Sequence, residues 1–395
     1  MSPPPNTPPQ APKSWQQEGA AKFCIGNAFF RSSSQTGRSL AILAALVYKQ
    51  QTLQGHQPFR VLDAMTGCGV RPLRYVLEAG ADFVWANEGN WDLRDRLQAN
   101  LSASLSPERY RITHQDANTV FFDCHQRQDF YDLIDIDSFG SPTPTLSTAL
   151  WAIKLGGLLY LTSTDGRATS GRAPEKSLQT YGAYARAHPA VHEQGLRLMI
   201  GAVLQQAAAR GLSAQPVFSF YNGEVNRVMV RITRNAPWNT DHYGFLAYCH
   251  SCGQFQTVPW KKLSRVNCVC TADSPPVLSG PMWLGPLHES DQLAAMYKEA
   301  KRLATTVSPA VAKQWKACQN LIQTMQQETP LPPYYYPLAE IGRRGKMDIP
   351  PRQQLLARLR QNGFAASTTH ISAQAIKTDA PIAQCLKLAA SRAEI

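Results

Sequence analysis

The chain has 395 residues, which is more than one ordinary hydrophobic core supports, so we expect two domains. Apolar residues make up 44% of it and charged residues 17%, a balance that excludes a wholly disordered chain. The net charge of +12 favours a polyanionic partner, although good solubility alone would be a sufficient reason for it.

The sequence contains no run of about 18 apolar residues, so we expect neither a membrane-spanning helix nor a membrane partner. Its first residues lack the basic and apolar regions of a secretory signal. Nine cysteines are too few for a disulfide scaffold in a chain of this length. Together these features predict a cytoplasmic protein.

The first half of the chain alternates between strand-like and helical patterns. Residues 1–18 include six prolines and predict a disordered tail, and an apolar run at 40–47 predicts a buried helix. Strand-like segments follow at 59–62, 83–86, 109–113, 131–136 and 158–162, with helical patterns before or between them. This alternation predicts an α/β fold with a doubly wound, mostly parallel, Rossmann-like sheet.

The second half differs in composition. A long helix is expected at 191–209 and a further strand at 228–232, and after about residue 235 Pro, Trp, Tyr and paired cysteines dominate. We therefore expect a first domain at 19–235 and a smaller α+β domain at 236–395.

The strand that ends at Asp63 is followed by a turn with Gly67 and Gly69, and then by Arg71. Ligands of parallel sheets bind beyond the carboxyl ends of the strands, where glycine allows a close approach of the backbone. The spacing acid-x-x-x-Gly-x-Gly is typical of methyltransferases, in which the acid and the turn hold the methionine part of S-adenosylmethionine. Taken alone, this short pattern is a weak signal.

Two further acids follow the next two strands. Glu88 is placed to bind both ribose hydroxyls of the cofactor, and Asp116 with Ala117 is placed to hold the adenine amine. Each acid alone is equally compatible with a solvated surface position. Three acids in order, each at a strand end, favour an S-adenosylmethionine site.

Asp137 and Phe139 follow the fourth strand of the expected sheet. The exocyclic amine of a nucleobase is a poor nucleophile, because its lone pair is delocalised into the ring. A carboxylate and a backbone carbonyl that accept its hydrogens would redirect that lone pair, and an aromatic ring would stack on an extruded base. The alternative is that Asp137 only caps the turn that follows, since Asp-Ser and Gly-Ser-Pro favour turns.

Four cysteines form two close pairs, Cys249 with Cys252 and Cys268 with Cys270, separated by fifteen residues. Four thiolates in two pairs suit tetrahedral zinc at a closed, structural site. The second pair has one intervening residue where two are more usual. The alternatives are four ordinary buried cysteines, or His250 in place of one thiolate ligand.

Several segments resemble those of the tRNA guanine-26 N2-dimethyltransferase family. Residues 134–142 resemble its Asp-Pro-Phe-Gly-Ser-Pro segment, and residues 29–38 resemble a segment whose last Arg contacts the cofactor. Further similar segments follow in the family's order at 192–197, 283–288, 333–336, 369–370 and 375–381. The resemblance spans residues 23–382 and implies methyl transfer to the N2 amine of guanosine 26 in tRNA.

The resemblance also implies roles for individual residues. Asp137 would face the guanine amine, and Phe29 and Phe139 would wall the base pocket. The cysteine cluster would hold zinc. Independently of the resemblance, we interpret His192 and Glu193 as a helix-face pair that stabilises the core. With the turn residues included, the residues expected to bind the cofactor are Arg38, Asp63, Gly67, Gly69, Arg71, Glu88, Asp116 and Ala117.

The chain departs from the family pattern at two places. Ser138 stands where the family usually has Pro, which would fix the backbone and aim a carbonyl. Residues 30–32, Phe-Arg-Ser, replace the usual aromatic-Asn-Pro. These departures leave open a neighbouring tRNA guanine as the target, or a tRNA-binding protein with weak or lost activity.

The C-terminal region carries many cations, and with its tyrosines at 334–336 it suits the tRNA backbone better than DNA. Any one of these cations would fit a solvated helix face equally well. Neither the oligomeric state nor the ratio of mono- to dimethylation is indicated. The cations considered are Arg343, Arg344, Lys346, Arg352, Arg358, Arg360, Lys377 and Lys387.

Overall fold

The computed structural model describes residues 15–53, 57–234, 239–268, 270 and 275–390. Among these, seven strands form the main sheet in the order β5-β4-β3-β6-β7-β9-β8. The first five of these run parallel, and β9 pairs antiparallel with both β7 and β8. The strands are β3 (Arg60–Asp63), β4 (Phe83–Asn87), β5 (Tyr110–Thr113), β6 (Tyr131–Asp137), β7 (Ile153–Ser163), β8 (Ser213–Asn222) and β9 (Val225–Thr233).

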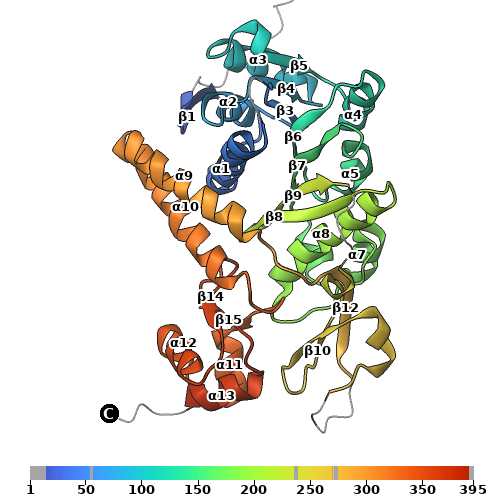
Figure 1. Ribbon diagram of the computed structural model, residues 1–395, viewed down its shortest axis with the longest axis vertical. Helices are drawn as coiled ribbons and strands as arrows, with labels where there is room; N and C mark the ends of the chain where they lie inside the picture. Colours follow the sequence, from blue (N-terminus) through green and yellow to red (C-terminus); the bar gives the residue numbers. More distant parts are fainter. Residues whose placement is uncertain (1–14, 54–56, 235–238, 269, 271–274, 391–395) are drawn as a thin grey trace, which may run out of the picture.

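Helices cover both faces of this sheet (Figure 1). Adjacent strand residues belong to different apolar clusters: Leu133 packs with α1, α2 and α3, and Ile134 packs with α4, α5 and α8. Both side chains are fully buried, because alternate residues of a strand point to opposite faces. The expected doubly wound α/β fold is confirmed. The helices are α1 (Gln35–Thr52), α2 (Val70–Leu77), α3 (Arg94–Ser102), α4 (Ala117–Gln126), α5 (Thr143–Ala149), α6 (Gly166–Thr169), α7 (Pro174–Tyr181) and α8 (Val191–Ala208).

The structure corrects the end of the expected disordered tail. Residues 15–18 form strand β1 (Trp15–Glu18), which pairs with β2 (Ala21–Cys24) as an antiparallel hairpin. The hairpin is anchored by Glu18, which is buried and accepts hydrogen bonds from Arg38 at 2.7 Å and Arg74 at 2.8 Å. The two buried guanidinium groups need a carboxylate partner, and Glu18 provides it. This contact orders the segment, and the amino-acid composition alone could not predict it. Residues 1–14 of the expected tail lie outside the described residues.

The C-terminal part contains two three-stranded sheets, β11-β10-β12 and β13-β15-β14, together with five helices among its described residues. The strands are β10 (Tyr243–Tyr248), β11 (Phe255–Val258), β12 (Val277–Trp283), β13 (Tyr336–Pro337), β14 (Ala366–Thr368) and β15 (Ala375–Thr378). The helices are α9 (Ser290–Thr306), α10 (Pro309–Glu328), α11 (Leu338–Gly345), α12 (Arg352–Gln361) and α13 (Ile382–Ala390).

Apolar packing crosses the domain boundary expected at residue 235. Helices α9 and α10 lie beside α1 (Figure 1), and their buried Met296 and Trp315 belong to the same apolar cluster as Leu43 of α1. Strand β12 packs in the same way against α8. The change in composition therefore does not coincide with a break between two separate cores.

Several side chains expected to face tRNA are instead buried. Lys377 is 2% exposed and contacts Glu193, and the three tyrosines at 334–336 are at most 8% exposed. Tyr334 stacks on Phe255 of β11 at 4.6 Å between ring centroids. Arg344 is held by the backbone of the cysteine loop and by Glu340. A buried charge or phenol needs a partner inside the protein. These side chains therefore contact residues of other elements of the fold rather than tRNA. No helix in the described part of the chain is long and apolar enough to span a membrane.

Candidate active site and metal centre

A cavity of about 620 Å³ lies beyond the carboxyl ends of β3, β4, β5 and β6. Loops after parallel strands meet at one edge of the sheet, which is where such folds bind ligands. The loops are tied together by Asn87, whose Nδ2 donates to the carbonyls of Ala64 at 3.0 Å and Gln115 at 2.9 Å. The sequence-predicted residues that line the cavity are Phe29, Arg38, Gly67, Arg71, Glu88, Asp116, Ala117, Asp137 and Phe139.

The predicted cofactor acids at the strand ends also hold the loops in shape. Glu88 accepts the N–H of Gly67 at 2.7 Å with one oxygen and the N–H of Asn90 at 2.8 Å with the other. Asp116 caps α4 by accepting the N–H of Asn118 at 2.9 Å. Gly67 lines the cavity at a φ of 59°, a conformation that glycine adopts without strain. These groups shape a polar wall on the β3 to β5 side.

Two predicted cofactor residues do not line the cavity. Asp63 is fully buried behind the turn, and burial together with nearby Asp135 raises its pKa well above the ordinary value. Its Oδ1 accepts the N–H of Met65 at 3.4 Å, so the carboxyl group supports the turn from beneath. Gly69 begins α2, where a Cβ would lie 2.8 Å from the side chain of Leu97. Its lack of a side chain therefore serves helix packing rather than approach to a ligand.

A chain of buried polar groups leads to Asp137. The hydroxyl of Tyr75 donates to Asp135 at 2.8 Å, and Arg71 donates to both Asp135 oxygens at 2.7 Å. Arg71 also donates to Asp137 Oδ2. Burial opposes ionisation of Asp137, but the guanidinium groups of Arg71 and Arg227 lower its pKa below the ordinary value. Asp137 is therefore a carboxylate at neutral pH, with 31% of its side chain exposed.

The two predicted aromatic residues lie on the outer wall of the cavity. Phe29 and Phe139 are 59% and 71% exposed and contact each other edge to face, with ring centroids 4.9 Å apart. A base stacked between two rings needs roughly 7 Å, twice the contact distance of two carbon layers. The pair therefore forms one aromatic wall rather than a sandwich.

Ser138 is anchored to the neighbouring strand. It is 7% exposed, and its hydroxyl donates to the carbonyl of Thr162 in β7 at 2.9 Å. A side-chain hydrogen bond thus restrains the segment between Asp137 and Phe139 by a route that Pro would not provide.

Asn87, Thr162 and Arg227 are among the cavity residues that sequence reasoning missed. Asn87 immediately precedes Glu88, so the strand-end pattern that indicated Glu88 could have indicated it. Thr162 and Arg227 come from β7 and β9, which pair directly at these two positions. A single Thr and a single Arg in two strands carry no motif, and only the pairing of the strands brings them to Asp137.

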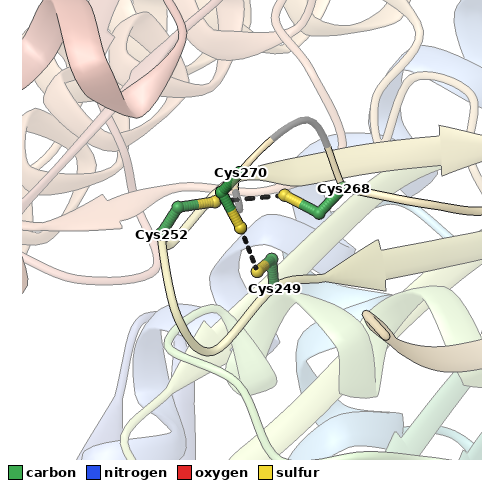
Figure 2. Close-up of side chains that lie close together, drawn as sticks. All are labelled: Cys249, Cys252, Cys268 and Cys270. Atoms are coloured by element: carbon green, nitrogen blue, oxygen red, sulfur yellow. Dashed lines mark hydrogen bonds between the residues drawn. The ribbon is translucent and has the colours of Figure 1, made fainter. Parts of the chain in front are cut away.

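The four predicted cysteines come together at one end of β10 (Figure 2). Cys249 Sγ lies 3.6 Å from Cys270 Sγ, and Cys252 Sγ lies 3.3 Å from Cys268 Sγ. Tetrahedral zinc with bonds of about 2.3 Å separates its sulfur ligands by about 3.8 Å, so the cluster fits this metal. All four sulfurs lie within 4.8 Å of one another, which leaves the site closed to a substrate.

A second compact cluster contains His288, Glu328 and His370, all buried. The N–H of Ser219 donates to Nδ1 of His288 at 3.2 Å, so Nε2 carries the proton and faces Glu328 Oε1 at 3.5 Å. A metal ligand needs a lone pair at that nitrogen instead. The cluster therefore fits a carboxylate between two imidazole N–H groups. Burial and nearby His370 keep His288 neutral by lowering its pKa to about 4.

Comparison with known proteins agrees with this geometry. A family model described as N2,N2-dimethylguanosine tRNA methyltransferase matches residues 16–390. The chain is 28% identical over 390 residues to the tRNA (guanine(26)-N(2))-dimethyltransferase of Pyrococcus horikoshii, with 92% of this chain and 95% of that protein covered. It is 28% identical over 345 residues to the protein of the same name from Schizosaccharomyces pombe, with 82% and 62% covered.

The fold is also similar to that of a solved structure. The structure of Trm1 from Pyrococcus horikoshii in complex with S-adenosyl-L-methionine matches with a TM-score of 0.80 and 27% identity. The match covers 95% of this chain and 99% of that chain, so it includes both the main sheet and the C-terminal part.

Proposed function

This chain belongs to the N2,N2-dimethylguanosine tRNA methyltransferase family, and we propose how its cavity binds cofactor and target base. It is an S-adenosylmethionine-dependent tRNA (guanine-N2)-methyltransferase that acts on guanosine 26. The observation that supports our assignment of residues is the position of Asp137. It is the last residue of β6, and it lines the same cavity as the polar wall of β3 to β5 and the aromatic pair.

The cofactor would lie along the polar wall. Glu88 would bind the ribose hydroxyls, and Asp116 with Ala117 would hold the adenine, since these residues line adjoining parts of the cavity. Gly67 would allow the methionine part to approach the backbone, and the cations Arg38 and Arg71 lie close by. We assign Asp63 and Gly69 only a supporting role, because both lie behind this wall.

S-Adenosylmethionine supplies an electrophilic methyl group. The N2 amine of guanine attacks that methyl carbon, the bond from carbon to sulfur breaks, and one N2 proton must leave. Asp137 would accept that N–H and receive its proton, because Arg71 keeps it ionised beforehand. The backbone carbonyl of Ser138 would accept the second N–H.

The target base must leave its stack in tRNA to reach Asp137. Phe29 and Phe139 form the exposed aromatic surface next to the cavity, and one face of the extruded base would stack against this pair. The exposed cations that remain in the C-terminal part, Arg343 and Lys346 among them, would contact phosphates.

The rest of the chain would support this site. Zinc held by the four cysteines would stabilise the loop after β10, and thiols in such a cluster fit a reducing, cytoplasmic location. We retain the division into a catalytic part at 19–235 and a tRNA-binding part at 236–395 as a functional one. DNA is not an expected substrate.

The test uses purified enzyme, labelled cofactor and tRNA transcripts. We expect label on wild-type tRNA and loss of label when guanosine 26 is replaced by adenosine. Nucleoside analysis of the product would then contain N2-methyl- and N2,N2-dimethylguanosine. Label that persists on the replaced transcript would contradict guanosine 26 as the target.

A further inference from the structure

Arg227 of β9 lies in the cavity with most of its hydrogen-bonding capacity unused. It is 2% exposed and lines the cavity near Asp137. Its Nη2 donates to Ser34 Oγ at 3.2 Å, whereas Nε and Nη1 are buried and have no hydrogen-bond partner among the described residues. Arginine remains charged in proteins, and a buried donor without a partner is costly. Such donors in a cavity therefore indicate a ligand with acceptor atoms.

The position of Arg227 indicates which ligand. It pairs with Thr162 of β7, on the side of β6 away from the β3 to β5 wall. Its Nη2 lies 3.7 Å from Asp137 Oδ1, the oxygen that Arg71 leaves free. Arg227 thus stands beside the carboxylate that faces the target amine.

The guanidinium is also restrained from turning elsewhere. A Cβ on Gly37 would lie 2.8 Å from both Cδ and Nε of Arg227, so α1 packs directly against the side chain. Tyr160 donates to the carbonyl of Gly37 at 2.9 Å and fixes that part of α1. The head group is consequently fixed next to Asp137.

Guanine offers a matching edge. Its N2 amine, N1–H and O6 are consecutive, so two donors lie beside one acceptor. If the carboxylate accepts from the donors, a guanidinium beside it is in place to donate to O6. Adenine has an amine at that position and cannot accept this hydrogen bond.

We propose that Arg227 reads the O6 atom of the target guanine and, with Asp137, selects guanine over other bases in the cavity. This assignment rests on the proposed function. The competing role is binding of the carboxylate of the cofactor, for which Arg38 and Arg71 also line the cavity.

The test compares two substrates with four enzymes. tRNA carries either guanosine or 2-aminopurine riboside at position 26; the latter keeps the 2-amine but lacks O6 and N1–H. The enzymes are wild type, Arg227→Met, Arg227→Lys and the control Arg231→Met. Arg231 lies on the same strand outside the cavity, where it donates to Gln292 at 3.1 Å. Single-turnover rates are measured with saturating cofactor.

We expect Arg227→Met to slow transfer to guanosine by about 10- to 100-fold, the range expected for loss of one hydrogen bond from a charged donor. The rate on 2-aminopurine should stay within about twofold of wild type, since that substrate has no O6 to lose. Arg231→Met should change neither rate. Arg227→Lys, which keeps the charge near Asp137, should show a smaller loss that is again confined to guanosine.

Calorimetric titration of the cofactor and thermal melting accompany the rates. An equal slowing on both substrates would overturn the role of Arg227, as would a tenfold weaker affinity for the cofactor. If Arg227→Met does not fold, the same two criteria apply to Arg227→Lys. Failure of the wild-type enzyme to methylate guanosine 26 would instead overturn the proposed function itself.

Discussion

Lys377 Nζ lies 2.7 Å from Glu193 Oε1, and this contact joins β15 of the C-terminal part to α8 of the main fold. Both side chains are buried, and Arg197 donates to the same oxygen at 2.7 Å. Burial opposes ionisation of Glu193, but Lys377 and Arg197 lower its pKa below 4.5. The cation therefore neutralises a carboxylate that water does not reach.

The change Lys377→Met keeps the apolar stem and removes the ammonium group. Breaking a buried pair from one side typically costs about 3 kcal/mol or more, so we expect a loss of that size in the free energy of unfolding. Urea titration measures it, with the exposed Lys387→Met as a control that should change stability by less than about 0.5 kcal/mol.

This contribution also has a definite pH dependence. Because the folded-state pKa of Glu193 is lowered, the stabilisation is complete above its ordinary pKa of 4.5 and declines as the pH falls through the lowered value. Lys377→Met should therefore be closest to wild type in acid. A loss below about 1 kcal/mol at neutral pH would argue against a structural role for the pair.

Asp137→Asn tests the proposed acceptor of the amine hydrogens. The amide cannot take up a proton and removes the charge that Arg71 balances. We expect the rate of methyl transfer to fall on the order of a hundredfold or more while the cofactor still binds. Single-turnover rates and calorimetric titration separate the two effects. Near-normal turnover would refute the assignment.

The pH profile of the wild-type enzyme offers an independent check on Asp137. Its pKa lies below the ordinary value of 3.8, so the carboxylate stays ionised throughout the neutral and mildly acidic range. Protonation of Asp137 should therefore not lower the rate of methyl transfer between pH 8 and about pH 5.

The sequence predicted the parts of the fold that rest on local patterns. Alternating strands and helices, the glycine turn after β3 and the paired cysteines each depend on neighbouring residues, and each is found. What it did not predict depends on distant contacts. Glu18 is ordered by two arginines from α1 and α2, and Lys377 is buried by Glu193 from α8. A basic residue appears the same in sequence whether it faces phosphate or a buried carboxylate.

Ser138 shows the same limit inside the site. From the sequence, a serine at this position predicted loss of the backbone restraint that Pro gives. In the structure, its hydroxyl donates a hydrogen bond to the carbonyl of Thr162. Strand pairing between β6 and β7 makes this contact possible, and no local pattern indicates it.

Removal of that hydroxyl is the next prediction. Ser138→Ala loses one hydrogen bond, a contribution of about 1 kcal/mol, and frees the segment that carries the amine-accepting carbonyl. We expect a severalfold lower rate and a larger share of monomethylated product, because the second transfer needs the same alignment. Thr143→Ala is the control, since its hydroxyl contacts Ser141 Oγ at 3.0 Å, a local contact two residues away. An unchanged rate and product ratio would show that the anchor is dispensable.

The cysteine cluster should bind one zinc ion per chain and hold the loop after β10 in place. Arg344 of α11 donates to the carbonyls of Ser251 and His250 at 2.8 Å, so the loop is also a contact with the C-terminal helices. Cys252→Ser should therefore lower the zinc content and the melting temperature and weaken tRNA binding. It should leave cofactor affinity unchanged, because β10 lies far from β3 to β6, whose carboxyl ends border the cavity (Figure 1).

Metal analysis of the purified variant measures the first effect, and filter binding and calorimetry measure the others. Cys318→Ala is the matched control, since Cys318 is buried in α10 away from the cluster. It should keep one zinc per chain and normal tRNA affinity. Full zinc content in Cys252→Ser would show that this thiolate is not a ligand. A parallel loss of cofactor affinity would show that the metal supports the whole fold rather than the loop alone.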